Sequence, residues 1–308
     1  MTRPSSGGLA LLVALFVAAA CDATSTPVDS GDIDAAQGSD ASVSDAGEGP
    51  DGALLDAARP DAARSDAGGG MLVLPTPNAS FDYQLGEPYA PPAGVEIVSR
   101  DRNAAPAPGL YTICYVNAFQ TQPDERAFWT TMHPGLLLRD AGGDLVIDPD
   151  WDEIILDVTT PESRSALAVI VGGWIDGCAE DGFDAIEIDN LDTYSRSGGL
   201  ISQDDAVAFM RLLSDIAHGH GLPIAQKNST EVLGRRSEMG TDFAIAEECN
   251  RYSECGDFTA VYGDLVLVIE YRRTDFDAGC RDFPELSIVL RDLNLSAPGS
   301  GSYVYDGC

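Results

Sequence analysis

The stretch D-G-F-D-A-I-E-I-D-N-L-D-T-Y occupies residues 181–194 and joins a short apolar run to a cluster of acids. The run predicts a buried strand over 185–188. Side chains alternate faces along a strand, so Glu187 and Asp189 should share one face while the neighbouring isoleucines share the other. Paired carboxylates at the carboxyl end of a strand are typical of active sites in α/β proteins. The alternative is an Asp/Asn-rich turn that only closes the strand.

Strand-like runs alternate with helical patterns on both sides of this stretch. Thr160-Pro161-Glu162 supplies an N-cap and a first-turn proline for a helix over 163–178, and further helices are expected over 202–218 and near 230–239. Strands are expected over 81–85, 95–99, 111–117, 153–158, 185–188, 223–226, 243–246, 265–269 and 287–290. The alternation predicts an α/β fold, a (β/α)8 TIM-type barrel, although this count includes one strand too many.

The first third of the folded region departs from the regular repeat. Its three strands are separated by Pro- and Gly-rich links such as 88–94 and 104–109. These links are too short to hold a crossover helix of about a dozen residues. We therefore expect an irregular, helix-poor opening to the barrel.

The N-terminus has the pattern of an export signal. Arg3 precedes an uninterrupted apolar run over 9–20, which is too short to span a bilayer. The small residues before Cys21 resemble a bacterial lipoprotein cleavage box, although Ala18 stands where such boxes usually carry Leu. We expect residues 1–21 to be a lipoprotein-type signal peptide and Cys21 to carry the lipid. A plain secretory signal is the alternative, and both predict an exported protein of the bacterial cell envelope or surface.

Residues 22–75 consist almost entirely of Asp, Ala, Ser, Gly, Thr and Pro and contain no aromatic residue. Such a segment cannot bury enough apolar surface to offset its chain entropy. It is expected to be a disordered acidic tether, and residues 76–308 are expected to form one barrel domain. We expect a monomer that meets a membrane only through the lipid anchor.

The formal net charge of the chain is -32. Nucleic acid is excluded as an expected partner, because binding it requires clustered Lys and Arg. An acidic surface attracts cations, so a polycationic substrate fits this balance. Solubility of an exported protein is the competing explanation.

Six of the seven cysteines lie in the expected domain. An even number of cysteines in an exported domain favours disulfides. Of the many possible pairings we expect Cys249–Cys255, which closes one short loop, together with Cys280–Cys308 and Cys114–Cys178. The chain has three histidines and no C-x-x-C pair, so a zinc site is not expected.

The expected strands end in polar side chains one after another, and such ends meet at one face of a barrel. These residues are Asp101, Asn117, Asp157, Glu187, Asp189, Asn190, Lys227, Asn228, Glu247, Glu248, Glu270 and Tyr271. Carboxylates near aromatic residues, without a Ser/His pair, favour glycoside hydrolysis, which needs one carboxylic acid and one carboxylate. Asp189 and Glu247 end different strands and can face each other across a sugar. The alternative is a divalent metal bound by these oxygens; we expect no metal and no other cofactor.

Five ordered motifs resemble glycoside hydrolase family 114, the endo-α-1,4-polygalactosaminidases. They are I-C-Y-V-N-A from Ile113, G-F-D-A-I-E-I-D-N-L-D-T-Y from Gly182, A-Q-K-N from Ala225, A-E-E-C-N-R-Y-S-E-C from Ala246 and V-I-E-Y from Val268. They cover most of residues 81–280. The resemblance implies a (β/α)8 barrel that cleaves α-1,4-linked galactosamine polymers, which are cationic where deacetylated.

The resemblance also implies roles for individual residues. Asp189 would be the nucleophile and Glu247 the general acid/base. The site would be lined by Glu187, Asn190, Tyr194, Lys227, Asn228, Glu270 and Tyr271. Lys227 would hold carboxylates ionised, or act only as a salt bridge that fixes the strand ends. Because an acid/base residue needs a raised pKa, we expect Glu247 to have the less polar surroundings. Tyr194 and Tyr271 would stack on sugar or pack over the barrel mouth.

Three departures from the family pattern lie near these residues. Ala246 and Glu248 replace the usual Asn and Gln beside the acid/base residue, Ile188 stands within the family's E-P-D-N motif, and 119–123 replaces a Trp-Glu-Asp segment. The carboxylate pair is retained, so we expect an endo-acting glycosidase of galactosamine-containing exopolysaccharide. A catalytically silent carbohydrate-binding lipoprotein and a glycosidase for another amino-sugar polymer are the alternatives.

Overall fold

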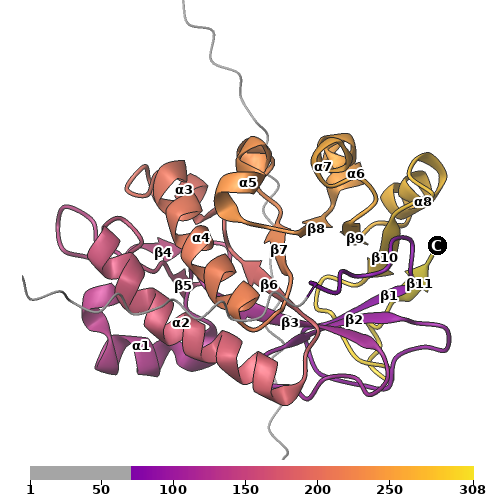
Figure 1. Cartoon of the computed structure of the whole chain (residues 1–308), viewed down its shortest axis with the longest axis horizontal. Coiled ribbons are helices and arrows are strands. Elements are labelled where there is room, and N and C mark those ends of the chain that lie inside the picture. Colours follow the sequence, from indigo (N-terminus) through magenta and orange to yellow (C-terminus); the bar gives the residue numbers. More distant parts are fainter. Residues whose placement is uncertain (1–70) are drawn as a thin grey trace, which may run out of the picture. The chain divides into compact units, whose positions relative to one another are not determined.

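In the computed structural model, which describes residues 71–308, parallel strands follow one another around a barrel-like sheet (Figure 1). Its parallel strands are β1 (Phe81–Gln84), β2 (Ile97–Asp101), β3 (Tyr111–Asn117), β6 (Ala185–Asp189), β7 (Ile224–Lys227), β8 (Phe243–Glu247), β9 (Val266–Glu270) and β10 (Ser287–Arg291). β11 (Tyr305–Gly307) pairs with β10 in the antiparallel sense. The expected TIM-type barrel is confirmed.

Part of the expected organisation lies outside the described residues. This applies to the signal peptide, to the lipidated Cys21 and to the tether as far as residue 70. Residues 71–76 have no regular structure, and the carbonyl of Val73 accepts a hydrogen bond of 2.7 Å from the Tyr111 hydroxyl. Within the described part of the chain, no helix has the length and apolarity needed to span a bilayer.

The surplus strand of the sequence analysis is 153–158. Its first two residues form β5 (Glu153–Ile154), which pairs with β4 (Ile147–Asp148) in a separate two-stranded antiparallel sheet. This β4–β5 hairpin lies between β3 and β6 in the sequence and is not a barrel strand. The apolar run 154–156 misled the prediction because a strand buried beside the barrel has the same pattern as one within it.

The helices begin and end where the sequence supplies the signals. The Thr160 hydroxyl accepts from the Ser163 N–H and caps α2 (Pro161–Asp181). Ser202 forms a capping box with Asp205 at the start of α4 (Gln203–Gly219). Gly182 follows the last residue of α2 and caps it with a φ of 89°, which is readily adopted only by glycine. The α-helices are α1 (Arg126–Met132), α2 (Pro161–Asp181), α3 (Thr193–Arg196), α4 (Gln203–Gly219), α5 (Arg236–Met239), α6 (Cys249–Tyr252), α7 (Cys255–Tyr262) and α8 (Arg273–Asp282). The 3-10 helices are η1 (Pro123–Glu125), η2 (Pro134–Leu136) and η3 (Thr230–Arg235).

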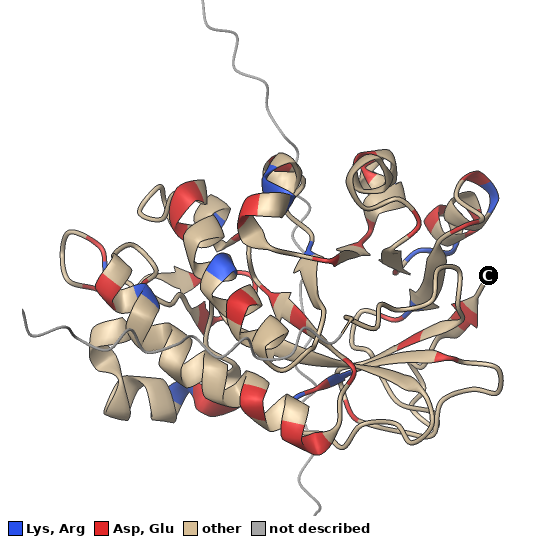
Figure 2. Ribbon diagram, in the orientation of Figure 1, with Lys and Arg blue, Asp and Glu red and all other residues tan. Residues whose placement is uncertain are grey.

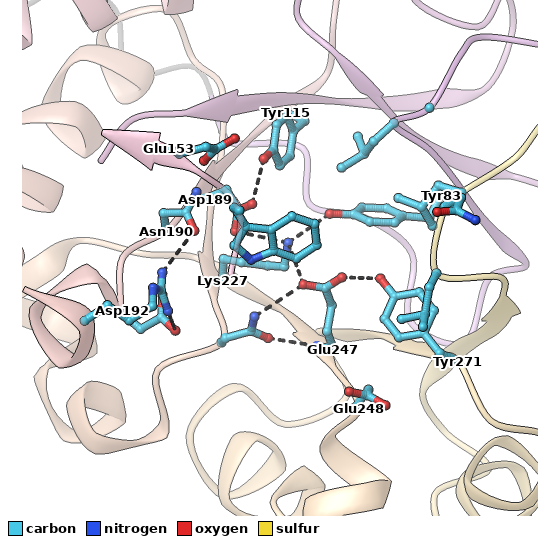
Figure 3. A pocket seen from close by; sticks show the side chains of 18 of the residues that line it. Tyr83, Tyr115, Glu153, Asp189, Asn190, Asp192, Lys227, Glu247, Glu248 and Tyr271 are labelled. Atoms are coloured by element: carbon cyan, nitrogen blue, oxygen red, sulfur yellow. Dashed lines mark hydrogen bonds and ion pairs between the residues drawn. The ribbon is translucent and has the colours of Figure 1, made fainter. Parts of the chain in front are cut away.

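Helices cover the later strands and leave the first ones bare. Within the described residues no helix separates β1 from β2 or β2 from β3, which confirms the helix-poor opening (Figure 1). Ile186 and Ile188 pack outward with α2 and α4, whereas Ile113 and Ile269 pack inside the barrel. The carboxyl ends of the strands open onto the cavity of Figure 3.

A buried ion pair closes the barrel between its first and last parallel strands. Nη1 of Arg291 on β10 lies 3.0 Å from Oδ1 of Asp82 on β1, and both side chains are fully buried. The same guanidinium donates to the backbone carbonyl of Tyr83. Since β1 and β10 share no backbone ladder, this side-chain contact holds the seam.

Acidic residues are spread over the outer helices as well as the strand ends (Figure 2). The charge of the protein is therefore not confined to one site. Local charges around a cavity are more informative about a ligand than the net charge.

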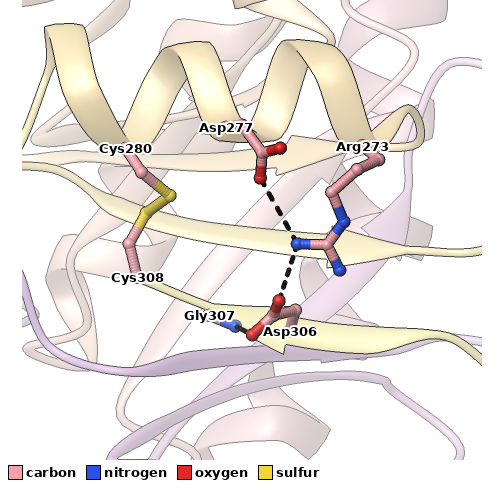
Figure 4. The surroundings of a disulfide bond; sticks show 6 residues. All are labelled: Arg273, Asp277, Cys280, Asp306, Gly307 and Cys308. Carbon is pink, nitrogen blue, oxygen red and sulfur yellow. Dashed lines mark hydrogen bonds and ion pairs between the residues drawn. A yellow bond between two sulfur atoms is a disulfide. The ribbon is translucent and has the colours of Figure 1, made fainter.

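Three disulfides join the six described cysteines in the expected pairs. Cys114–Cys178 ties β3 to α2, and Cys249–Cys255 joins α6 to α7. Cys280–Cys308 fixes the strand β11 beside α8, where Arg273 also lies between Asp277 and Asp306 (Figure 4).

Replacing Cys280 and Cys308 together with serine should lower the free energy of unfolding by about 3 kcal/mol, because this cross-link restricts the unfolded chain. Denaturant titration of the non-reduced protein measures the change. The Cys249–Cys255 bridge spans 6 residues against 28 for Cys280–Cys308, so serines at that pair should cost less. The reverse order would contradict the chain-entropy explanation.

Candidate active site

A cavity of about 740 Å³ opens at the carboxyl ends of the barrel strands. Residues from β1, β3, β5, β6, β7 and β8 line it together with residues of the loops after the strands, including those after β9 and β10 (Figure 3). Parallel strands deliver their last side chains to the same face, so residues far apart in the sequence meet here.

Lys227, the last residue of β7 and the only lysine of the 308 residues, lies at the centre of the site. Its side chain is 2% exposed, and its Nζ lies 3.0 Å from Glu187, 3.3 Å from Asp189 and 3.3 Å from Glu247. Burial acts to lower the pKa of Lys227, but the three carboxylates outweigh it and hold the pKa well above the usual value. The ammonium is therefore charged, and it draws the ends of three strands together.

Glu187 lies one layer deeper than Asp189 on the same face of β6, as the period of two predicts. Its carboxylate is buried and accepts hydrogen bonds from the Tyr83 hydroxyl at 2.7 Å and the Ser99 hydroxyl at 2.6 Å. Burial raises the pKa of Glu187, although Lys227 and these two donors oppose the change. Glu187 does not line the cavity; it positions Lys227 from below.

Asp189 ends β6 and lines the cavity. Burial acts to raise its pKa, but the Lys227 ammonium, the Tyr115 hydroxyl at 2.7 Å and the backbone N–H of Asn190 outweigh burial and lower it. Asp189 is thus held as a carboxylate. An ionised carboxylate is the form required of a nucleophile.

Glu247 ends β8 on another wall of the cavity. It accepts hydrogen bonds from the Tyr271 hydroxyl and, at 3.4 Å, from the side chain of Asn228. Its side chain is 27% exposed against 19% for Asp189. Both carboxylates contact Lys227 at 3.3 Å and a tyrosine hydroxyl, so the expectation of less polar surroundings for Glu247 stays a prediction.

The two carboxylates are close to each other. Oδ1 of Asp189 and Oε2 of Glu247 are each 3.3 Å from the same Nζ, so they are no farther apart than twice that distance. The carboxyl groups of retaining glycosidases are about 5 to 5.5 Å apart, and those of inverting enzymes roughly 6.5 to 9.5 Å. The bound on this pair of oxygens includes the separation found in retaining enzymes.

Tyr115→Phe is expected to lower kcat/KM by about tenfold or more at acidic pH, because it removes a hydrogen bond to the charged form of Asp189. That bond lowers the pKa of Asp189, so its loss raises the pKa. The acid limb of the pH profile of kcat/KM should then move to higher pH. An unchanged acid limb with a uniform loss of rate would contradict this role.

The amides that follow two of the strands orient the carboxylates. Asn190 and Asn228 have positive φ angles of 65° and 46°, a conformation that Asn tolerates better than most residues. The Asn228 side chain accepts from the backbone N–H of Glu247 at 2.8 Å. Asn117, which is buried beside the cavity, accepts from the Asn190 amide at 3.0 Å.

Besides Glu187 and Asn117, three more of the predicted site residues do not line the cavity. Asp157 accepts from the hydroxyl and backbone N–H of Thr159 in an irregular segment. Glu270 lies on the outward face of β9, where it accepts from the backbone N–H of Asn250. The Tyr194 hydroxyl contacts Glu231 at 3.1 Å. Asn190, Lys227, Asn228 and Tyr271 do line the cavity with the two carboxylates.

Several residues that line the cavity were not predicted from the sequence. Tyr83 lies two residues before the expected end of the first strand at residue 85, and Tyr115 lies two residues before Asn117. Strict alternation of strand faces would therefore have found both tyrosines. Trp151, Glu153 and Arg196 come from the β4–β5 hairpin and α3, and no periodic pattern identified them.

Within the described residues, the group that could hold a metal is Cys249, Cys255 and Glu270, but the two cysteines form a disulfide and offer no thiolate. At the cavity, Lys227 already supplies the positive charge between the carboxylates.

A (β/α)8 barrel that brings two carboxylates together at its strand ends has the architecture of a glycoside hydrolase. The model of glycoside-hydrolase family GH114 matches residues 62–308. The chain belongs to this family.

Solved structures agree with this assignment at the level of the fold. Ega3 of Aspergillus fumigatus, in complex with galactosamine, is 20% identical with a TM-score of 0.63, and the match covers 78% of this chain and 98% of Ega3. The glycoside hydrolase domain of PelA from Pseudomonas aeruginosa is 16% identical with a TM-score of 0.50, covering 73% and 98%. The search of curated proteins found no match.

Proposed function

We propose that this glycoside hydrolase is an endo-acting enzyme that cleaves α-1,4-linked galactosamine-containing exopolysaccharide, with Asp189 as nucleophile and Glu247 as general acid/base. The observation that carries the proposal is the contact of one buried ammonium, Lys227, with both carboxylates at 3.3 Å. A binding protein has no need of an acid and a nucleophile held this close.

The reaction takes two steps. Glu247 gives its proton to the glycosidic oxygen while Asp189 attacks the anomeric carbon, which breaks the glycosidic bond and forms a glycosyl ester. Glu247, now a carboxylate, takes a proton from water, and the water oxygen attacks the anomeric carbon and releases Asp189. Lys227 stays charged throughout and stabilises Asp189 as it leaves.

Two displacements at one carbon retain its configuration. The first product released from an α-linked polymer should therefore be the α-anomer, as followed by proton NMR before mutarotation. A β-anomer as first product would contradict the role of Asp189 as nucleophile and would leave it the base of an inverting enzyme.

The charge of the cavity supports a cationic substrate. Five acids line it, Glu153, Asp189, Asp192, Glu247 and Glu248, against the two bases Arg196 and Lys227. Its volume of about 740 Å³ is in the upper part of the usual range for ligand sites, roughly 300 to 1,000 Å³. A segment of a polymer suits such a site. The galactosamine bound to Ega3 points to the same class of sugar.

The test is release of soluble oligosaccharides from partly deacetylated α-1,4-galactosaminan by the purified protein. An endo-acting enzyme should produce a range of chain lengths early in the reaction, and monosaccharide alone would contradict endo action. Binding without release would favour the catalytically silent binding protein. Cleavage of a different amino-sugar polymer, with galactosaminan left intact, would favour a glycosidase for that other polymer.

Location is proposed from the sequence alone. The protein is exported and held at the cell envelope or surface through lipid on Cys21. A Cys21→Ser variant should lose incorporation of radiolabelled palmitate and leave the membrane fraction; retention of label would contradict the anchor. A monomer without a nucleic-acid partner remains a prediction.

A further inference from the structure

The turn of the β4–β5 hairpin is fixed against the catalytic face of the barrel. Asp148 is buried, its Oδ2 lies 2.7 Å from Nε of Arg196, and the same oxygen accepts from the Gln120 amide at 3.0 Å. Its Oδ1 accepts from the backbone N–H of Asp150 inside the turn. These contacts hold residues 148–153 in one arrangement.

This turn presents two side chains to the cavity. Glu153 lies beside Asp189 and Asn190 (Figure 3), and its Oε2 accepts from the Asn117 amide at 3.0 Å. Trp151 also lines the cavity, and 66% of this large apolar residue is exposed. An indole held in the open at the wall of a sugar site offers an apolar face for the C–H face of a pyranose ring.

Glu153 differs from the other acids of the cavity wall. Asp189 and Glu247 contact Lys227, Asp192 is paired with Arg196 at 2.6 Å, and Glu248 is paired with Arg251 at 2.6 Å. Across residues 71–308, Glu153 has no ion pair, and its hydrogen-bond partner is a neutral amide. It is the carboxylate left to meet a cation brought by the substrate.

Charged groups on three neighbouring elements face Glu153. Burial raises its pKa to about 7; the Asn117 hydrogen bond lowers the pKa, Asp189 on β6 and Asp148 on β4 raise it, and Arg196 on α3 lowers it. An ammonium placed beside it would favour the ionised form, as any close positive charge does.

We infer that Glu153 and Trp151 form the subsite that recognises a sugar with a free amino group, in which Glu153 accepts hydrogen bonds from the ammonium and Trp151 stacks on the ring. The inference rests on the proposed function and names its preferred substrate as the deacetylated form. An N-acetyl group brings no charge and would leave Glu153 without a cationic partner. A hydrogen bond to a charged group contributes about 1.5 to 3 kcal/mol, which corresponds to roughly ten- to hundredfold in affinity.

The test compares Glu153→Gln and Trp151→Ala with the wild type on α-1,4-galactosamine oligosaccharides, fully deacetylated and fully N-acetylated. Glu153→Gln keeps the shape and the bond from Asn117, and should lower the ratio of kcat/KM for the deacetylated over the acetylated substrate by tenfold or more. Trp151→Ala should lower kcat/KM for both substrates alike. Asp144→Asn removes the same charge from an exposed position in the turn that precedes the hairpin and should leave the ratio unchanged.

Calorimetry with galactosamine and N-acetylgalactosamine separates this inference from the proposed function. The wild-type protein should bind galactosamine more tightly as the pH rises through about 7. Below about pH 7, binding should release the proton of Glu153. The Glu153→Gln variant should lose both effects. An unchanged substrate ratio in Glu153→Gln, or an equal fall for both substrates, would overturn the inference while hydrolysis by the wild type stands. If the wild type cleaves neither oligosaccharide, the proposed function fails, and the inference then stands only if the amine preference in binding is present and depends on Glu153.

Discussion

Asp189→Asn is expected to lower kcat/KM on the polymer by on the order of 10⁴-fold, because it removes the nucleophile while keeping the shape of the side chain. Asn retains an oxygen for the Tyr115 hydroxyl, which donates at 2.7 Å in the wild type, so the strand end should keep its structure. Reducing-end release measures the loss. Asp264→Asn, at an exposed position far along the chain, controls for the change in net charge.

Glu247→Gln separates the two roles. A dinitrophenyl leaving group departs without a proton, so this variant should cleave an activated aryl α-galactosaminide while losing activity on the polymer. Asp189→Asn should fail on both substrates, because each needs the nucleophile. Equal losses of Glu247→Gln on the two substrates would contradict its role as the acid.

Lys227→Met is expected to lower the free energy of unfolding by about 3 to 5 kcal/mol at neutral pH and to abolish most activity, because it leaves buried carboxylates without their counter-ion. The loss of the ammonium should destabilise the charged form of Glu187 most, because the Glu187 side chain is fully buried and water cannot solvate it. The double variant Lys227→Met/Glu187→Gln should regain part of the stability but not the activity, because Asp189 still lacks the ammonium. Equal stability of the single and double variants would contradict this explanation.

The difference in free energy of unfolding between the wild type and Lys227→Met should depend on pH, and the pKa shifts give the direction of this dependence. The folded-state pKa of Asp189 is lowered, so its contribution to stability is present above its unfolded value of about 4 and is lost as pH falls through the folded pKa. Glu187 has a raised pKa, and its contribution is present below the unfolded value and is lost as pH rises through the folded pKa. The stability difference between wild type and Lys227→Met should therefore be largest near neutral pH and should narrow below about pH 4.

Much of this site was predictable because two simple rules govern a barrel. Strand alternation placed Glu187 and Asp189 on one face, and the convergence of carboxyl ends brought Lys227 and Glu247 to them. The same alternation shows why Glu270 was misplaced: its neighbour Ile269 on β9 packs inside the barrel, so Glu270 faces outward.

The remaining features depended on contacts that no local pattern encodes. The segment 153–158 resembles a barrel strand, yet it packs beside the barrel, so Glu153 became a cavity residue while Asp157 did not. The surroundings of Glu247 depend on donors from β7 and from the residue after β9. The Arg291–Asp82 pair joins residues at opposite ends of the domain and could not be read from spacing.

The most direct test of the account is to trap the glycosyl ester with a 5-fluoro galactosaminyl fluoride, whose electron-poor ring slows both steps while the fluoride leaves readily. Mass spectrometry of the digested protein should then show one added sugar on the peptide that contains Asp189, and none on that peptide in Asp189→Asn. A sugar on the Glu247 peptide, or turnover of the reagent with no labelled peptide at any time, would contradict the assignment of Asp189 as the nucleophile of a retaining glycosidase.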